Sequence, residues 1–307
     1  MMQLKLTSPC CLLLGMADID GRTHQLGVAL TYPPIEIEAR RSALLLITGG
    51  RADLAYRQAE RFLEHHGLPR QGEIEIELAI PSFMGLGSAG MLGLSVARTL
   101  AELGELPADD AQALASAAGL GADEALETHA FAHGGLLLVD DAGGLARRVP
   151  IAHAGEDAAW VWVLVLPRVP SGAVESLEAE RRAELRAAAR HLGAGRASCE
   201  QLFGAAERDD IAAFAAALGE IQQLNDDALR LAETPHPLDD AEARLLAIMR
   251  GHGALVCGRA LGGLALYGLI QGAGPSRALR RALTAELGFF GGSVIGSVCS
   301  PHGATLE

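Results

Sequence analysis

The segment GLGSAG at residues 85–90 holds the residue types with the clearest chemical use in this chain. It follows a strand-like run that ends at Pro81, and an apolar run with helical spacing begins directly after it. Glycine lets the backbone approach a ligand closely, and the free N–H groups of a helix N-terminus favour anions. The Ser88 hydroxyl can cap the helix or reach a phosphate or its metal ion. The segment predicts a phosphate-binding loop, and a tight turn without a ligand is the alternative.

Patterns of apolar residues predict the elements that position this loop. Continuous or alternating apolar runs indicate strands at 4–16, 25–39, 73–80, 134–140, 160–167 and 292–300. Helical spacing indicates helices at 51–67, 88–103, 107–119, 177–192, 197–232, 239–253 and 277–288. This mixed order predicts an α+β protein with an N-terminal phosphate-loop domain at 1–160 and a C-terminal domain at 161–307.

Length, charge and cysteine content exclude several classes of protein. The chain has 307 residues, half of them hydrophobic, and a net charge of −13. This acidity disfavours nucleic acid and anionic membranes as partners, and the apolar runs are too short for a membrane span. The five cysteines form no C-x-x-C pair, which disfavours a disulfide framework or a zinc site. We expect a cytoplasmic protein that binds a small molecule.

The order of motifs along the chain resembles that of a known family. The pattern P-x-x-x-G-L-G-S-A at 81–89 resembles the second motif of the GHMP superfamily, which includes galactokinase, homoserine kinase, mevalonate kinase and phosphomevalonate kinase. In the kinases of that superfamily the loop wraps the nucleotide phosphates. The segments at 8–30, 129–140, 160–167 and 289–306 resemble those of one branch, the β-ribofuranosylaminobenzene 5'-phosphate synthases. The resemblance covers essentially the whole chain.

This resemblance implies a fold and a reaction. The implied fold has a ribosomal-S5-domain-2-like N-terminal domain and a ferredoxin-like C-terminal domain, with the ligand cleft between them. The implied reaction joins an aminobenzoate or hydroxybenzoate to phosphoribosyl pyrophosphate and releases carbon dioxide and pyrophosphate, in tetrahydromethanopterin biosynthesis. The implied cofactor is Mg²⁺, and the branch suggests a homodimer.

The resemblance also suggests which residues form the site. Asp18 matches an aspartate of the branch and is expected to contact substrate or metal, although aspartate also favours turns. Ser88 and Asp123 are the expected metal ligands. Arg259, in a third glycine-rich segment, can bind a phosphate with two N–H groups, although a surface arginine is the commoner case. The predicted phosphate-binding residues are Gly85, Leu86, Gly87, Ser88, Ala89 and Arg259.

Several positions depart from the pattern of the branch. Its R-S-G-I-G segment is replaced here by a stretch that contains Asp123 and Glu124, and its R-I-H becomes Cys10-Cys11-Leu12. Two carboxylates at that place repel a phosphoribosyl group unless a metal ion intervenes. The glycine-rich segment at 257–268 also lacks the serines of the branch.

These departures leave two alternatives to the synthase open. One is a small-molecule kinase that uses Mg-ATP, with Asp123 or Glu127 as the base, unless these two residues lie on a solvated helix face. The other is a noncatalytic relative that retains the scaffold. A synthase requires a basic cleft, and a kinase requires a loop that is not plugged by Phe83, Met84 or Met91.

Overall fold

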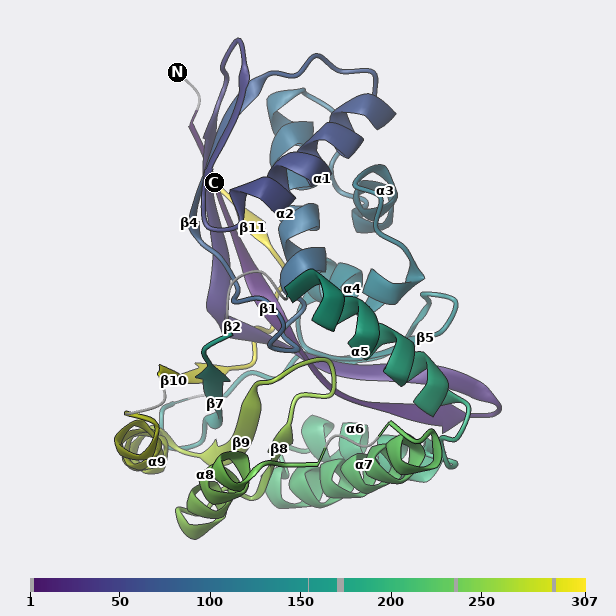
Figure 1. Cartoon of the computed structure of the whole chain (residues 1–307), viewed down its shortest axis with the longest axis vertical. Coiled ribbons are helices and arrows are strands. Elements are labelled where there is room, and N and C mark those ends of the chain that lie inside the picture. The colour runs from purple at the N-terminus through teal and green to yellow at the C-terminus, as the bar shows by residue number, and fades with distance from the viewer. Residues whose placement is uncertain (1–2, 154, 170–173, 235–236, 289–290) are drawn as a thin grey trace.

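The protein is built around two β-sheets, seen together in Figure 1. The computed structural model describes residues 3–307 except 154, 170–173, 235–236 and 289–290. The first sheet has the order β11-β1-β2-β4-β3, and β5 joins it through β2 and carries β6. Its strands are β1 (Gln3–Ile19), β2 (Arg22–Arg40), β3 (Leu45–Gly49), β4 (Gly72–Leu78), β5 (Leu136–Asp140), β6 (Leu145–Val149) and β11 (Thr305–Leu306).

The long hairpin of β1 and β2 forms the backbone of the first sheet. Its turn consists of Asp20 and Gly21, with φ of 56° and 79°, a pair of left-handed residues that suits a two-residue hairpin. The pairing shifts register between Leu13 and Gly15, which marks a bulge in β1. A layer of helices covers one side of this sheet in Figure 1. They are α1 (Ala52–His65), α2 (Ser88–Leu103), α3 (Ala111–Ala117) and α4 (Ala125–His133).

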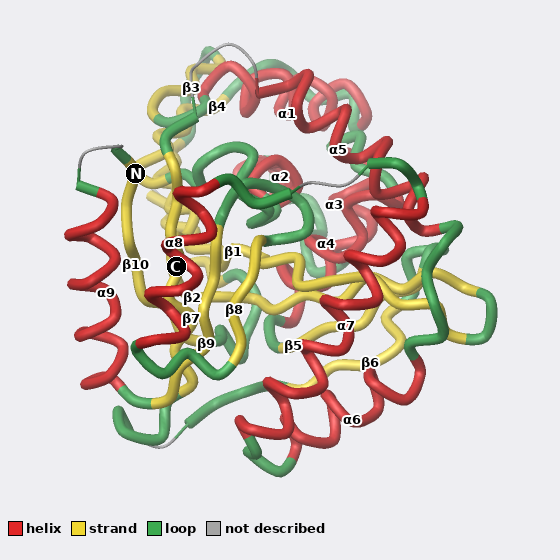
Figure 2. Tube along the Cα trace, turned by 60° about the horizontal axis from the view of Figure 1, so that its bottom comes forward, coloured by secondary structure: helices red, strands yellow, loops and turns green. Residues whose placement is uncertain are grey.

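The second sheet has the order β10-β7-β9-β8 and its own layer of helices, as Figure 2 shows. Its strands are β7 (Trp160–Pro167), β8 (Val256–Arg259), β9 (Leu266–Gln271) and β10 (Gly292–Val298). Helices α8 (Asp240–Gly251) and α9 (Ala273–Leu287) pack on it around Val163, Met249 and Leu283, all fully buried. The mixed architecture confirms the α+β class predicted from the sequence.

Three further helices link the two sheets. These are α5 (Val174–Ala189), α6 (Arg196–Glu207) and α7 (Ile211–Leu231). The helix expected over 197–232 is interrupted because Asp209 takes a left-handed φ of 56° and the Asp210 side chain caps α7 by accepting from Ala213 N. In the part of the chain that the structure describes, no helix is long and apolar enough to cross a membrane.

The side chain of Asn225 in α7 completes the hydrogen bonding of β1 at its bulge. Its Oδ1 accepts from Met16 N at 2.9 Å and its Nδ2 donates to Met16 O at 2.8 Å. Asn225 is 3% exposed, so its amide is the buried partner of both Met16 backbone groups in the folded protein. This contact ties the second half of the chain to the first sheet.

We predict that Asn225→Ala lowers the free energy of unfolding by about 3 kcal/mol, because two buried backbone groups lose their partners at about 1–3 kcal/mol each. Chemical denaturation monitored by circular dichroism measures this change. Gln223→Ala on the same helix is the matched control, since Gln223 is exposed and its side chain donates to Asp227 of the same helix. Equal effects of the two substitutions would contradict the role given to Asn225.

Candidate functional site

The glycine-rich loop between β4 and α2 is held from two sides by backbone hydrogen bonds. Leu13 N of β1 donates to Gly85 O at 3.1 Å, and Cys11 N donates to Leu86 O at 3.0 Å. On the other side, Leu264 N donates to Phe83 O at 3.0 Å. The loop therefore bridges the first sheet and the segment between β8 and β9.

Two glycines of the loop are required by its geometry. Gly85 and Gly87 take φ of 73° and 69°, a region that side chains disfavour. A Cβ on Gly85 would lie 2.8 Å from the Ala260 Cβ, and one on Gly87 would lie 2.7 Å from the Glu127 Cγ. The close approach of Glu127 and Ala260 therefore excludes larger residues at both positions.

Helix α2 begins directly at this loop without a side-chain cap. Gly87 is its N-cap residue, and no side-chain hydrogen bond to the first turn is present among the described residues. An uncapped helix N-terminus presents backbone N–H donors and a partial positive charge. Gly87, Ser88, Ala89 and Gly90 all line a cleft, so these donors adjoin a space that an anion can enter.

The cleft has a volume of about 330 Å³ and is enclosed by segments from both halves of the chain. The glycine loop and the start of α2 form one wall. Met16, Thr23 and Gln25 of the β1–β2 hairpin, the 3-10 turn η1 (Ala122–Glu124) and the start of α4 form others. Helix α5 closes the remaining side and lies beside α4 in Figure 1.

The charges that line the cleft are mixed, with an acidic excess. Its carboxylates are Asp123, Glu124, Glu127, Asp141 and Glu178, and its guanidiniums are Arg181, Arg182 and Arg186. The described residues therefore lack the basic cleft that a synthase was expected to require. This acidic excess counts against a synthase unless a bound cation offsets it.

Helix α5 is attached across the cleft by polar contacts. Arg182 Nη1 lies 2.9 Å from Glu124 Oε1, and Arg186 forms an ion pair with Asp123. Glu178 Oε1 accepts from Phe83 N at 3.3 Å. Arg182 and Arg186 thus stand beside acids of the opposite wall, whereas Arg181 pairs with Glu184 of its own helix.

Glu127 is the most unusual ionisable group of the cleft. Its Oε2 has almost no contact with solvent and no hydrogen-bond partner among the described residues. Gly87 and Gly90 leave the room that its side chain occupies beside the start of α2. Burial is the main cause that raises the pKa of Glu127 to about 7, and the nearby Glu124 raises it further. A carboxyl group with such a pKa can hold or release a proton near neutral pH.

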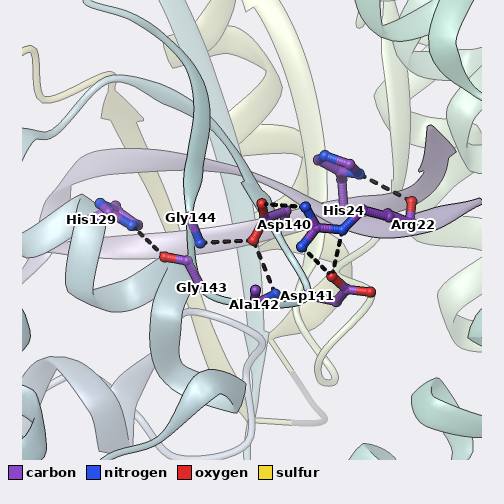
Figure 3. A network of polar contacts seen from close by, with 8 residues as sticks. All are labelled: Arg22, His24, His129, Asp140, Asp141, Ala142, Gly143 and Gly144. Atoms are coloured by element: carbon purple, nitrogen blue, oxygen red, sulfur yellow. Dashed lines mark hydrogen bonds and ion pairs between the residues drawn. The ribbon is translucent and has the colours of Figure 1, made fainter. Parts of the chain in front are cut away.

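A polar network surrounds the turn between β5 and β6 (Figure 3). It includes Asp141, which lines the cleft. Asp140 Oδ1 accepts from Gly144 N at 2.8 Å, which is the main cause that lowers the pKa of Asp140. Arg22 Nη2 lies 2.8 Å from the Oδ1 of Asp141, a cleft residue. His129 Nε2 lies 2.9 Å from Gly143 O. The network fixes the turn against the β1–β2 hairpin.

The structure brings most of the residues predicted for the site together. Gly85, Gly87, Ser88, Ala89 and Asp123 all line the cleft. Leu86 is buried in the core at 1% exposure, so only its backbone belongs to the loop surface. Phe83 lines the cleft, whereas Met84 and Met91 are buried in the core and do not plug it.

Two predicted residues lie elsewhere. Asp18 Oδ1 accepts from Gly21 N at 3.0 Å, so its carboxylate stabilises the hairpin turn, and Asp18 is not a lining residue of the cleft. Arg259 of β8 forms an ion pair with Glu242 of α8 and lines a separate cavity. The Asp18 carboxylate is therefore occupied by the N–H of Gly21 in the hairpin turn. The Arg259 guanidinium is paired with Glu242, which belongs to the N-terminal capping box of α8.

The sequence analysis did not single out the arginines of α5. Arg182 directly follows Arg181, and Arg186 lies four residues after Arg182. Such spacing also occurs on any solvated helix. Only the packing of α5 against η1 and the loop identifies them. Among the described residues, no group of three or more His, Cys, Asp or Glu side chains is arranged to hold a metal ion.

Comparisons with known proteins agree with this geometry. Residues 53–135, which include the glycine loop, match the family model of the GHMP kinases N terminal domain. The β-ribofuranosylphenol 5'-phosphate synthase of Archaeoglobus fulgidus is 30% identical over 144 residues, which are 44% of this chain and 44% of that protein. The match therefore spans less than half the length of that relative.

Solved kinase structures share the fold over nearly the whole chain. Homoserine kinase from Cytophaga hutchinsonii has a TM-score of 0.66 and 16% identity, with 99% of this chain and 97% of that chain covered. Mevalonate kinase from Methanococcus jannaschii has a TM-score of 0.60 and 14% identity, with 96% and 98% covered. At this identity the likeness shows the fold, which is the one that the sequence motifs implied.

Proposed function

This chain belongs to the GHMP superfamily, and from that premise we propose that it is a phosphoribosyl-transferring synthase like its relative from Archaeoglobus fulgidus. In this proposal the protein joins phosphoribosyl pyrophosphate to an aromatic acid such as a hydroxybenzoate or aminobenzoate. The uncapped N-terminus of α2, held by left-handed glycines at the cleft, carries the proposal. It supplies the donors that a pyrophosphate group requires.

Two arginines of α5 are suited to assist the binding of the donor. The side chains of Arg182 and Arg186 are 44% and 64% exposed, so both can exchange a carboxylate partner for a phosphate. A guanidinium binds phosphate oxygens with paired N–H groups. In the free protein Glu124 and Asp123 hold these two cations at the cleft and so keep them close to the incoming anion.

The excess of carboxylates fits a donor that arrives with a divalent cation. Mg²⁺ typically binds one or two carboxylates together with substrate phosphates, rather than a complete protein cage. Ser88 and Asp123, which both line the cleft, are the residues proposed to contact it. When bound, Mg²⁺ neutralises negative charge on the diphosphate and makes it a better leaving group.

The proposed reaction exchanges one bond at the ribose and one at the aromatic ring. The bond from ribose C1 to pyrophosphate breaks, and its electron pair stays on pyrophosphate. A bond forms between C1 and the ring carbon that carried the carboxylate, and this group leaves as carbon dioxide while its bonding pair returns to the ring. Glu127 is proposed to hold the proton of the ring hydroxyl or amine as electron density shifts.

A small-molecule kinase is the second candidate, because Asp123 and Glu127 line the same cleft as the glycine loop. In that case the loop binds the phosphates of Mg-ATP, and a carboxylate accepts the proton of the attacking hydroxyl. Thermal-shift titrations separate the candidates, since a ligand stabilises the native state in proportion to its occupancy. A synthase is stabilised by phosphoribosyl pyrophosphate, a kinase by Mg-ATP, and a noncatalytic relative by neither.

The substitution Asp123→Asn sharpens this test. For a synthase we predict that metal-free pyrophosphate binds the variant with unchanged or higher affinity, because Asp123 no longer competes for Arg186. Magnesium pyrophosphate is expected to bind the variant more weakly, because Asp123 is one of the residues proposed to contact Mg²⁺. For a kinase with Asp123 as base, phosphoryl transfer falls by about 10²–10⁴-fold. Calorimetric titration with pyrophosphate, once without and once with Mg²⁺, measures the changes in pyrophosphate affinity, and an ATP-consumption assay measures the loss of phosphoryl transfer. Loss of metal-free pyrophosphate binding in the variant would contradict the synthase assignment of this residue.

A further inference from the structure

A second cavity lies behind one wall of the cleft. It has a volume of about 520 Å³ and is lined by residues of α5, α7, α8, β1 and β8. Arg181 lines both spaces. In β1, Leu13 lines the cleft and its neighbour Leu14 lines the second cavity. After β8, Gly262 lines the cleft and its neighbour Leu261 lines the second cavity. The two spaces therefore share a thin wall.

The second cavity has the opposite charge pattern to the cleft. Four arginines line it, and Asp226 is the one carboxylate among the lining residues that the structure describes. The arginines are Arg181, Arg230, Arg250 and Arg259. Arg181 is 6% exposed, so its guanidinium is part of the protein interior.

Three of these guanidiniums already have a carboxylate partner outside the lining. Arg181 Nη1 lies 3.1 Å from Glu184 Oε2, Arg230 Nη1 lies 2.8 Å from Asp227 Oδ1, and Arg259 pairs with Glu242. A guanidinium carries five N–H donors, and the bonds that Arg181 and Arg230 form within the described part of the chain engage only some of them. Arg250 forms no ion pair with a carboxylate in the described part of the chain.

We propose that this second cavity binds a small carboxylate with an apolar body. Guanidinium forks match a carboxylate, and Leu14, Leu229, Leu246 and Leu261 supply an apolar wall. Its volume lies within the range of about 300–1,000 Å³ that is usual for small-molecule sites. Among the described lining residues there is no glycine-rich helix N-terminus, the feature that favours phosphate in the cleft.

This site goes beyond the proposed reaction, but one of its arginines contacts the segment that packs on the glycine loop. Arg181 Nε donates to Leu261 O at 2.8 Å. Two residues further on, Gly263 packs so closely on the glycine loop that a Cβ there would lie 2.2 Å from Gly85 N. Arg181 therefore connects a ligand of the second cavity to the segment that supports the phosphate-binding loop.

Calorimetric titration with cyclohexanecarboxylate and its neutral amide, cyclohexanecarboxamide, tests the proposal on the intact protein. We expect the acid to bind at least about tenfold more tightly than the amide, because only the acid pairs with the guanidiniums. Inorganic phosphate at equal ionic strength is expected not to displace it. Equal affinity of acid and amide, or displacement by phosphate, would overturn the assignment.

A cavity-filling variant locates the bound acid. Gly219 of α7 lines the cavity on the same helix face as Gln222, Gln223 and Asp226, and a Cβ there meets no atom within 4 Å. Gly219→Leu is therefore expected to fold, since leucine favours a helix, and to weaken acid binding at least about tenfold. Gly274→Leu on α9 is the matched control, because Gly274 also has open space and lies outside the cavity.

A second variant and a second ligand separate this site from the cleft. Arg250→Gln removes a cation from the rim and is expected to weaken acid binding about threefold or more, with pyrophosphate binding unchanged. Unchanged acid binding in both Gly219→Leu and Arg250→Gln would refute the site. If the acid binds the wild type while pyrophosphate does not, the proposed function fails and this inference stands.

Discussion

Gly87→Ala is expected to weaken the binding of magnesium pyrophosphate by at least about tenfold, which corresponds to about 1.4 kcal/mol. A side chain at φ of 69° is strained, and its Cβ would lie 2.7 Å from the Glu127 Cγ and 3.4 Å from the Cys11 Cβ. Either the glycine loop or Glu127 has to move. Both movements displace the N–H groups that begin α2 from the position of the anion.

Gly67→Ala is the control for this substitution. Gly67 also takes a left-handed φ, 61°, but a Cβ there meets nothing within 4 Å. The two variants carry similar backbone strain, and only one of them disturbs the loop. Calorimetric titration of both with magnesium pyrophosphate, beside denaturation curves, separates binding from stability. Equal pyrophosphate affinities in the two variants would show that the loop does not hold the anion.

Glu127→Gln is expected to remove a pH dependence of stability. Folding raises the pKa of Glu127 from 4.5 to about 7, so the folded state binds the proton more tightly than the unfolded state. The contribution of Glu127 to stability therefore falls as the pH rises from about 4.5 to 7, by about 3 kcal/mol. Glutamine stays neutral, so the variant is expected to gain stability relative to wild type across this window and to match it near pH 4.

Denaturation at a series of pH values between 4 and 8 measures this difference. Glu75→Gln is the control, because the Glu75 side chain of β4 is exposed. A stability difference between Glu127→Gln and wild type that does not change with pH would contradict the buried state of this carboxyl group. If Glu127 also transfers a proton in the reaction, the variant loses turnover while it keeps pyrophosphate affinity.

The local elements were largely predictable because their sequence patterns are strong. Helix α2 spans Ser88–Leu103, as its apolar spacing after the glycine loop predicted. The alternating run at 73–80 became β4, which pairs with β2 in the register Ile37↔Ile76. In both places local propensity and burial favour the same structure, so the sequence alone was sufficient to predict the type of the element and its approximate position.

Other elements had weaker signals. Strand β3 has only five residues and β6 contains Arg147 and Arg148, so neither forms a long apolar run. Arg148 is instead positioned by its bonds to His133 O and Pro301 O, at 2.7 Å each. Contacts between residues this distant in sequence leave no periodic pattern, and they could not be predicted.

The site was predictable in its loop and not in its charges. A glycine-rich segment before a helix is a local feature, whereas the ion pairs of Arg182 and Arg186 depend on how α5 packs against η1. Likewise, Asp18 and Arg259 have the chemistry of ligand contacts, but local partners, Gly21 N and Glu242, use that chemistry. Residue type shows what a side chain can do, and tertiary packing determines what it contacts.

The central claim is the transfer of a phosphoribosyl group at this cleft. Its most direct test is an assay with phosphoribosyl pyrophosphate, Mg²⁺ and 4-hydroxybenzoate or 4-aminobenzoate labelled at the carboxylate carbon. The account predicts that labelled carbon dioxide and pyrophosphate are released in equal amounts, only when both substrates are present, and that Gly87→Ala reduces both. Release of neither product, together with ATP consumption in the presence of a small alcohol, would contradict it and identify a kinase.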